Sequence, residues 1–567
     1  MARPAGPPDT AQRLWSRRPL VAQTPPLLPE KNDVEPVKKD EPKPEAKPKA
    51  EDPKKGVEVK IDADGITRRI IALPLPPGNY GGVLAADTNV FYFRDGGIFQ
   101  FSLSDRKESP VLAGINGLAV SADRKKILYR HGQAFGIVDL RPGQKPGDGA
   151  LRLVDMTMKI EPRLEWAQIF NDAIRIYRDW FYVRNMHGVD WAGMKEKYGR
   201  LVPTLGHRAD LDFIFGELVG ELNVGHAYVE WGDIPWVSRV EGGLLGAELS
   251  ADAKAGRYVI KKIYPGESWN EALRSPLTES GVDVKEGDYL IALNGRDVTL
   301  KDNPYQFLEN AFGRRIAISV NAKPEPAGAR ESWIRPIKSE QGLFYLDWVQ
   351  SRRALAEKLS GGRVGYIHVP DTSVPGNMEL FKGFYSYSEK DALIIDERYN
   401  GGGFIPGRMV EILHRPLLSY WAGRNPGMTK VPNYVHSGPK AMLINHYSAS
   451  GGDAFPYFFK ELNIGPLIGT RTWGGLVGIG GNPVFIDGGS IDVPQSGIVG
   501  TNGEWVVEGV GVSPDIEVWD SPDQVVKGHD PSLEKAVEVL MKELAAKPAM
   551  KPVKPADPDR SKWREKK

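Results

Sequence analysis

From about Gly342 onward, short apolar runs typical of strands alternate with segments whose apolar residues have helical spacing. The strand-like runs are VGYIHV, ALIIDER, AMLINH and LIGTRT, and we predict helices near MELFKGFYSY, RMVEIL and DAFPYFFKEL. This alternation predicts an α/β domain. Such domains place functional loops at the carboxyl ends of strands, and YNGGGF and YSASGGDAF follow two of the predicted strands.

Upstream of this domain the apolar pattern changes several times, as expected for a chain of 567 residues, which is too long for one hydrophobic core. From about Val57 to Val154, short strand-like runs are separated by turn residues, a pattern typical of β-propeller blades. The region suffices for about two blades, whereas a closed propeller usually needs about four or more. The chain is therefore a fragment of a longer protein, or its blades complete another structure, or the region is a small β-sheet domain of its own.

Two further regions separate these blades from the α/β domain. Residues 156 to about 232 have helical spacing and predict a helical subdomain, whose last helix runs into NVGHAYVEWG. Residues from about Gly242 to Pro336 predict strands around one or two helices. There EGDYLIALNGRDV, with a tight turn at Asn294-Gly295, resembles the PDZ family, and GGLLGAEL stands where that family has its peptide-binding loop. The resemblance implies binding of an extended peptide as an added strand.

The composition argues against several functions. The formal net charge of +1 gives no support to nucleic-acid binding, and the absence of cysteine excludes disulfides, thiolate metal sites and cysteine nucleophiles. The first thirty residues lack the uninterrupted apolar stretch of a secretory signal, and no segment has the apolar length of a membrane span, so we expect a cytoplasmic protein without a membrane partner. Residues 1–56, rich in Pro, Lys and Glu, and the basic residues 546–567 are predicted to be disordered spacers.

Ser450 stands between a predicted strand and a predicted helix, in the segment YSASGGDAF. A serine nucleophile needs a base, a group that orients the base, and backbone donors for the oxyanion, and a strand-to-helix turn exposes its hydroxyl near a positive helix end. The segment is equally compatible with a simple helix cap formed by Ser450 or Asp453. Likewise, Gly401-Gly402-Gly403 either presents backbone N–H groups to an oxyanion or forms a tight structural turn.

Four segments, ALIIDERYNGGGF, YSASGGDAF, LIGTRTWGG and VVEGVGVSPD, resemble in order and style the C-terminal processing peptidase superfamily of serine peptidases. One branch of that superfamily uses a lysine base, but the matching position here is Gly475. The order of the modules from about residue 57 to 540 instead resembles the tricorn protease family, whose base is a histidine. This resemblance implies a crotonase-like α/β core. It also implies that Ser450 is the nucleophile, His226 the base and Glu508 the acidic member, and that Gly403 and Gly451 form the oxyanion hole.

The resemblance also implies an overall function and organisation. It implies hydrolysis of oligopeptides to very short products through an acyl-enzyme, without a metal or other cofactor, by a homo-oligomer that is a toroidal hexamer. The predicted fold class is multidomain α+β. Its predicted parts are a disordered segment (1–56), partial propeller-like blades (57–155), a helical catalytic subdomain (156–238), a PDZ-like domain (239–340), the α/β peptidase core (341–545) and a disordered tail (546–567).

One position departs from the tricorn pattern, in which a serine before the base histidine links it to the glutamate. Here that residue is Gly225, so the link between Glu508 and His226 would pass through water or through a direct contact. Among the other eight histidines, His446 is the strongest rival base because it lies four residues before Ser450. A chain whose triad has decayed would instead be a non-catalytic scaffold that binds peptides with its PDZ-like groove and its blades.

Overall fold

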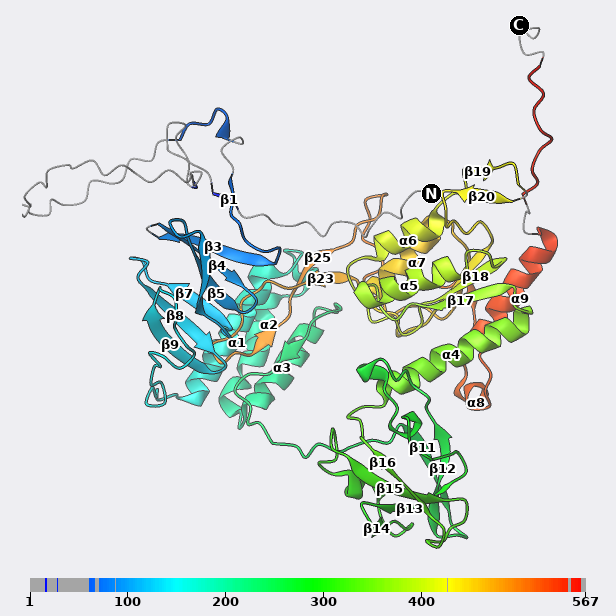
Figure 1. Ribbon diagram of the computed structural model, residues 1–567, viewed down its shortest axis with the longest axis horizontal. Helices are drawn as coiled ribbons and strands as arrows, with labels where there is room; N and C mark the ends of the chain where they lie inside the picture. The colour runs from blue at the N-terminus through cyan, green and yellow to red at the C-terminus, as the bar shows by residue number, and fades with distance from the viewer. Residues whose placement is uncertain are drawn as a thin grey trace, which may run out of the picture. The chain divides into compact units, whose positions relative to one another are not determined.

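The computed structural model describes residues 16–17, 28, 61–66, 71–86, 88–425, 427–548 and 552–561 (Figure 1). Most of the predicted disordered segment 1–56 and part of the predicted tail 546–567 lie outside these residues. The chain divides into two compact units, residues 1–159 and 160–567. Within the described residues, no helix combines the length and the apolar composition needed to cross a membrane.

The first unit contains two antiparallel sheets in which strands adjacent in sequence are paired. The four-stranded sheet consists of β3 (Tyr80–Ala86), β4 (Asn89–Arg94), β5 (Gly97–Ser102) and β6 (Lys107–Leu112), and the three-stranded sheet of β7 (Gly117–Val120), β8 (Lys126–His131) and β9 (Ala134–Asp139). Residues of both sheets, among them Phe91 and Ile127, share one apolar cluster. A short pair, β1 (Ser16–Arg17) with β2 (Ile71–Ala72), completes the described strands of this unit.

The helical region begins the second unit. Its elements are α1 (Pro162–Trp180), α2 (Trp191–Gly199), α3 (Arg208–Gly220) and two short 3₁₀ helices, Met186–Gly188 and Val202–Thr204. Its apolar cluster also includes Phe485, Ile491 and Val493, which come from a segment far along the chain. That segment forms β24 (Ser490–Ile491), which pairs antiparallel with β10 (Val229–Glu230) just after the predicted base. The predicted helices are confirmed, and a distant segment holds them.

The PDZ-like region is an antiparallel sheet with the strand order β11-β12-β13-β15-β16, in which β14 also pairs with β13. The strands are β11 (Ala247–Asp252), β12 (Arg257–Ile263), β13 (Tyr289–Leu293), β14 (Arg296–Asp297), β15 (Ile316–Asn321) and β16 (Arg330–Ile334). The predicted turn is present, with positive φ at Asn294 and Gly295. The predicted helices are instead short 3₁₀ helices at Glu271–Leu273, Pro276–Thr278 and Pro304–Leu308. Proline starts the second and third of these segments and favours helix initiation there, but all three end within one or two turns.

The core is a parallel sheet with the strand order β17-β18-β21-β22-β26. The strands are β17 (Val364–His368), β18 (Ala392–Asp396), β21 (Lys440–Ile444), β22 (Leu467–Gly469) and β26 (Ile516–Glu517). Alternate residues of each strand face two different apolar clusters, for example Leu393 one cluster and Ile394 the other. Both faces are therefore covered, which explains why the strands read as continuous apolar runs.

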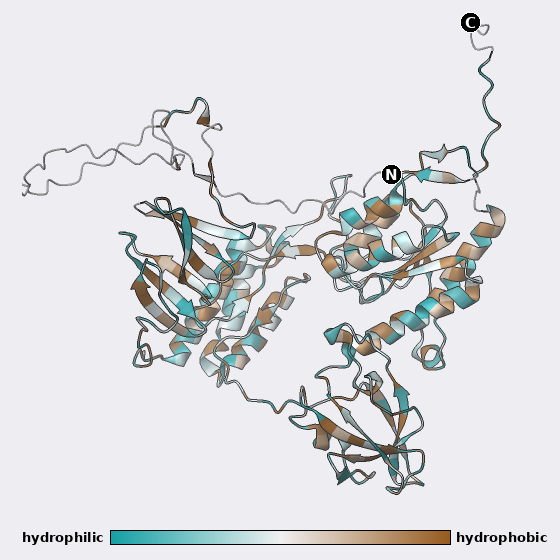
Figure 2. Ribbon diagram, viewed as in Figure 1, coloured by the Kyte–Doolittle hydropathy of each residue, from teal (hydrophilic) through white to brown (hydrophobic). Residues whose placement is uncertain are grey.

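Helices cover the two faces of this sheet. One face carries α5 (Val374–Ser386), α6 (Pro406–His414) and α7 (Gly451–Glu461), and the other α4 (Gln341–Ser360) and α9 (Pro531–Ala546). In Figure 2, α4 and α9 show both teal and brown along their length, as expected for helices with one buried face. The remaining elements are the hairpin β19 (Ser419–Ala422) and β20 (Met428–Val431), the pair β23 (Val477–Ile479) and β25 (Pro494–Gly497), and α8 (Pro522–Val525).

Candidate active site

Ser450 follows β21 and is the N-cap residue of α7. Its backbone has φ 60° and ψ −113°, a conformation that non-glycine residues rarely adopt and that costs energy to hold. Its N–H donates to Oδ2 of Asp453 at 2.7 Å, three residues into the helix. Of the two candidate capping residues, Ser450 and Asp453, Ser450 therefore holds the N-cap position. It does so in a strained turn at the carboxyl end of a strand rather than in an ordinary extended cap.

The glycine run after β18 packs directly against Ser450. A Cβ atom placed on Gly402 would lie 2.8 Å from Cβ of Ser450, and one placed on Gly451 would lie 2.7 Å from N of Gly403. Gly402 and Gly403 have φ of +89° and +141°, so glycine is required there for backbone as well as steric reasons. The N–H groups of Gly403 and Gly451 have no acceptor among the described residues. Two free backbone donors thus lie beside the Ser450 side chain.

Asp453 connects Ser450 to the loop at residues 472–475. Its side chain is fully buried and accepts hydrogen bonds from the N–H of Ser450, the N–H of Gly474 at 2.7 Å and the hydroxyl of Thr472. The N–H of Gly475 also donates to it, at 3.3 Å. Burial raises the pKa of Asp453, while these four donors act in the opposite direction. A carboxylate with four donors fixes both the Ser450 turn and the loop 472–475.

His226 lies at the end of the helical region, with a positive φ of 53°. Its Nδ1 is 3.0 Å from the hydroxyl oxygen of Tyr228, and its ring meets Trp473 edge to face with the ring centres 5.4 Å apart. Burial lowers the pKa of His226, while the negative charges of Glu508 and Asp492 act in the opposite direction. A lowered pKa keeps the imidazole neutral at pH 7, which is the form that accepts a proton.

Glu508 binds the backbone beside His226 rather than the imidazole. Its Oε1 accepts the N–H of Gly225 at 2.7 Å, and its Oε2 accepts the N–H of Leu476 at 2.7 Å. The direct contact between Glu508 and His226 that the sequence left open is therefore not a hydrogen bond here. Glu508 follows Val507, whose positive φ of 73° is highly unusual for a β-branched residue and marks a strained, specifically held segment.

Gly225 has no room for the side chain that the tricorn pattern would place there. A Cβ atom on Gly225 would lie 2.8 Å from Cα of Gly475 and 3.3 Å from Oε1 of Glu508. The first distance is too short for a real contact with backbone. Where the tricorn pattern has a serine side chain, the loop that carries Gly475 therefore lies close to Gly225. The backbone N–H of Gly225, rather than a serine hydroxyl, donates to Glu508.

The structure thus joins the predicted residues in two groups. Ser450, Gly403 and Gly451 form one group, and Glu508 with the Gly225-His226 segment forms the other; Asp453 and the loop 472–475 connect the two. Ser450 and His226 are not hydrogen-bonded to each other. The rival base His446 is exposed, and its ring packs on Tyr447 and Trp519.

Three regions of the chain match known protein families. Residues 162–220 match the family "Tricorn protease C1 domain", residues 243–339 match "Tricorn protease PDZ domain", and residues 363–518 match "Peptidase family S41". The chain belongs to the tricorn protease family. The S41 match covers the strands and loops that carry Ser450 and Glu508, and identifies this part as a domain of the serine-type peptidase class.

Relatives of this family match most of the chain. Tricorn protease homolog 1 of Streptomyces coelicolor is 30% identical over 521 residues, which are 87% of this chain and 48% of that protein. The tricorn protease of Thermoplasma acidophilum is 28% identical over 501 residues, 85% of this chain and 46% of that protein. A crystal structure of the tricorn protease has a TM-score of 0.77 and 26% identity, covering 86% of this chain and 49% of that one. The chain therefore spans about half the length of these relatives.

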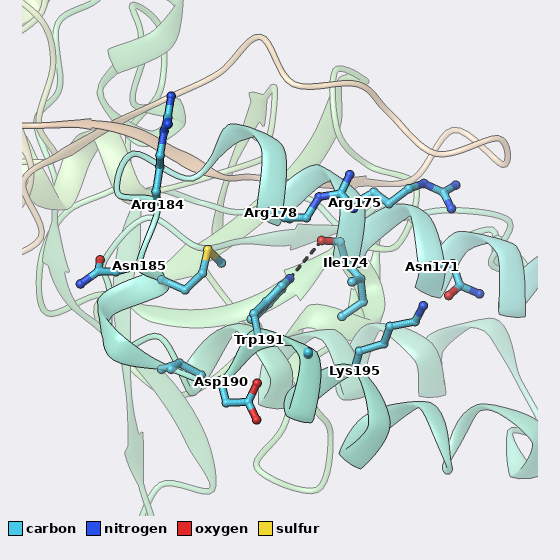
Figure 3. Close-up of a pocket in the computed structure, with 12 residues that line it drawn as sticks. Asn171, Ile174, Arg175, Arg178, Arg184, Asn185, Asp190, Trp191 and Lys195 are labelled. Carbon is cyan, nitrogen blue, oxygen red and sulfur yellow. Dashed lines mark hydrogen bonds between the residues drawn. The ribbon is translucent and has the colours of Figure 1, made fainter.

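The cavities outside the Ser450 group include one in the helical region and one at the carboxyl end of β17. One, of about 540 Å³, is in the helical region, where Figure 3 shows basic side chains around Trp191, whose indole N–H donates to the Ile174 carbonyl at 3.0 Å. None of the predicted site residues of this tricorn family member lines it. The other cavity, of about 410 Å³, is apolar and lies at the carboxyl end of β17, lined by Phe344, Tyr345, Trp348, His368, Pro370 and Tyr399. It borders the glycine run, because the N–H of Gly401 donates to the carbonyl of Pro370 at 3.0 Å.

The sequence did not reveal three of the residues that shape this site. The sequence indicates Asp453 as a possible helix cap. Its contact with the loop 472–475 is long-range and has no local sequence signature. Tyr228 and Trp473, which contact the His226 ring, stand in segments of ordinary composition. No local pattern predicts these contacts, because the positive φ of His226 breaks the extended spacing that would place His226 and Tyr228 on one face.

Proposed function

We propose that this chain is a serine endopeptidase that hydrolyses oligopeptides to short peptides, with Ser450 as the nucleophile, His226 as the base and Glu508 as the acidic member. The observation that carries the proposal is the packing of Ser450 against two backbone N–H groups without acceptors, those of Gly403 and Gly451. Backbone donors that are fixed before the substrate arrives stabilise the oxyanion of acyl transfer, and this stabilisation is usually the largest single contribution to catalysis.

The proposed reaction proceeds by acyl transfer. Oγ of Ser450 attacks the peptide carbonyl carbon, its proton passes to His226, and the N–H groups of Gly403 and Gly451 bind the resulting oxyanion. Collapse of the intermediate breaks the C–N bond, and the leaving amine takes the proton from His226. Water then attacks the Ser450 ester, His226 again accepts a proton and returns it to Ser450, and the peptide acid leaves.

In this proposal Nε2 of His226 is the atom that exchanges the proton, because Nδ1 faces the hydroxyl of Tyr228. Ser450 and His226 must approach to hydrogen-bond distance when a peptide binds; such bonds are often long or absent without substrate. Glu508 acts through charge and position, since it holds the N–H of Gly225 and its negative charge favours the imidazolium that forms during the reaction.

Further parts of the proposal concern organisation. We propose that the sheets β3–β6 and β7–β9 are two blades of an incomplete propeller, supported by their four- and three-stranded meanders. The crotonase-like form of the core and the homo-hexameric assembly, drawn from the resemblance to the tricorn family, also stay proposals. So do the domain boundaries at residues 56, 155, 238, 340 and 545 and the cytoplasmic location, drawn from the sequence pattern.

A second candidate function is a peptide-binding scaffold without catalysis. It is favoured by Gly225 in place of the linking serine and by the absence of a hydrogen bond between Ser450 and His226. Hydrolysis of short fluorogenic peptides by the wild type, Ser450→Ala and His226→Ala, with a fluorophosphonate label as a second readout, separates the two functions. An active wild type that labels at Ser450, beside two inactive variants with unchanged thermal unfolding, supports the peptidase. A folded wild type that neither cleaves nor labels refutes it and favours the scaffold.

A further inference from the structure

The loop that leads into β11 binds a carboxylate of the chain itself. The N–H groups of Gly246 and Ala247 both donate to Oε1 of Glu340, at 2.7 and 3.3 Å. Gly246 has a positive φ of 71°, which lets consecutive N–H groups converge on one acceptor. Converging backbone N–H groups of this kind form an anion-binding concavity. The loop at residues 245–247, hereafter the nest, is therefore a carboxylate site, and Glu340 occupies it.

Glu340 arrives at the nest together with an apolar side chain. It is the residue before α4, and Leu343, in the first turn of that helix, is only 2% exposed. Cδ1 of Leu343 lies 3.2 Å from the position of a Cβ atom on Gly246. Burial raises the pKa of Glu340, while the two N–H groups act in the opposite direction. A carboxylate beside a buried apolar side chain is also the chemistry of a peptide's C-terminal residue.

The nest has donors that Glu340 leaves unused. The N–H of Leu245 has no acceptor among the described residues. The hydroxyl of Ser275 is buried, lacks a hydrogen-bond partner, and lies 3.1 Å from the position of a Cβ atom on Gly246. Unpartnered buried donors cost stability, so their presence beside an anion site indicates a ligand with more acceptor capacity than the one oxygen that Glu340 supplies.

The strand that starts in the nest has an open edge. β11 begins at Ala247 and is the terminal strand of its sheet, paired only with β12 among the described strands. A peptide whose C-terminal carboxylate enters the nest can therefore continue along β11 as an added antiparallel strand, with main-chain hydrogen bonds.

We propose that Glu340 is the resident internal ligand of this nest, and that the C-terminal carboxylate of a peptide binds here only by displacing it. In the absence of such a peptide, the contact clamps the start of α4 to the PDZ-like sheet. Displacement frees the first turn of α4, which leads to Tyr345 and Trp348, two residues that line the apolar cavity beside the glycine run. Occupancy of the nest is thereby connected to the neighbourhood of Ser450.

The test measures binding and does not depend on catalysis, so its failure is distinct from a failure of the proposed peptidase activity. The probes are two fluorescein-labelled hexapeptide pools, randomised at the last three positions, one ending in a free carboxylate and the other in an amide. Fluorescence anisotropy compares full-length chains that all carry Ser450→Ala, without further change or with Glu340→Ala, Glu340→Gln or Glu331→Ala. Glu331 is exposed on β16 of the same sheet and serves as the matched control.

We expect Glu340→Ala to bind the carboxylate pool at least tenfold more tightly than the parent and the Glu331→Ala chain, with no comparable gain for the amide pool. Glu340→Gln, which keeps the size but loses the charge, should show a smaller gain in the same direction, and it decides the matter if Glu340→Ala does not fold. The proposal is overturned if the parent already binds the carboxylate pool as tightly as the variants. It is equally overturned if folded variants bind neither pool or both pools alike.

Discussion

The nucleophile side and the base side of the candidate site are built in different ways. On the nucleophile side, Ser450 is held by a strained turn and by the buried carboxylate of Asp453, which has four donors. On the base side, His226 is positioned by ring contacts and by Glu508, which binds the backbone N–H groups of Gly225 and Leu476 and not the imidazole. The first side is fixed when the parallel sheet folds, whereas the second depends on how the helical region is held against the core.

That attachment rests on the segment that includes residues 485–493. Arg208 of α3 forms a buried ion pair with Asp487, with 2.6 Å between Nε and Oδ2, and the hydroxyl of Tyr177 in α1 donates to the carbonyl of Asp492 at 2.7 Å. The comparison teaches that changes to the buried Asp453 network on the nucleophile side should reduce stability and activity together, because this network serves both. Changes on the base side should mainly reduce activity.

The largest effect is expected from Asp453→Ala. Four donors lose their acceptor, at about 1–3 kcal/mol for each that stays buried and unpaired, so we expect a loss of about 3 kcal/mol or more. The melting temperature should fall by about 6 °C or more, and hydrolysis should drop to the level of Ser450→Ala. Thermal unfolding and fluorogenic hydrolysis measure both, with Glu411→Ala on the exposed side of α6 as the control. An Asp453→Ala chain with wild-type activity would show that the nucleophile turn does not need this network.

Glu508→Gln tests the base side through its charge. The amide still fills the space but removes a negative charge that raises the pKa of His226, so that pKa should fall further. Because the neutral imidazole is the active form, the acidic limb of the pH profile of kcat/KM should move to lower pH. We also expect kcat to fall about tenfold or more, since the imidazolium loses about 1.4 kcal/mol or more of stabilisation. A limb that stays in place or moves to higher pH would contradict the role of Glu508.

Gly225→Ala tests the close approach between the two sides. The added Cβ would lie 2.8 Å from Cα of Gly475, and such overpacking costs about 1–3 kcal/mol. We expect the shift of the His226 segment to lower kcat about tenfold, with a smaller loss of stability than for Asp453→Ala. The matched control is Gly216→Ala inside α3, where a Cβ meets nothing within 4 Å; helix propensity should stabilise that variant by about 0.5–1 kcal/mol. Equal kcat in both variants would mean that Gly475 does not constrain His226.

The sequence predicted the nucleophile side better than the base side, for a physical reason. Ser450 and the glycine run each follow an apolar strand of the core, and the parallel sheet brings strand ends together, so local pattern plus fold class places both. The approach of His226 to Glu508 joins residues far apart in the chain. It depends on β24 pairing with β10, a contact between two-residue strands with no periodic signal.

The PDZ-like region shows the same limit. Its strands and the Asn294-Gly295 turn follow from alternation and turn chemistry, whereas the predicted helices are short 3₁₀ segments. The contact of Glu340 with the nest was not predictable, because a glutamate before a helix is ordinarily a solvated capping residue. Only the fold places its carboxylate on the N–H groups of Gly246 and Ala247.

The smallest effect, and the sharpest test of the base side, is expected from Tyr228→Phe. The change removes the hydroxyl 3.0 Å from Nδ1 of His226 and keeps the ring. A neutral hydrogen bond contributes about 0.5–1.5 kcal/mol, so kcat should fall about two- to tenfold while KM and thermal unfolding stay unchanged. In a His226→Ala background the same substitution should have no further effect on residual hydrolysis, because the hydroxyl then has no imidazole to orient. A loss of the same size in both backgrounds would show that Tyr228 acts on the substrate or the fold and not through His226.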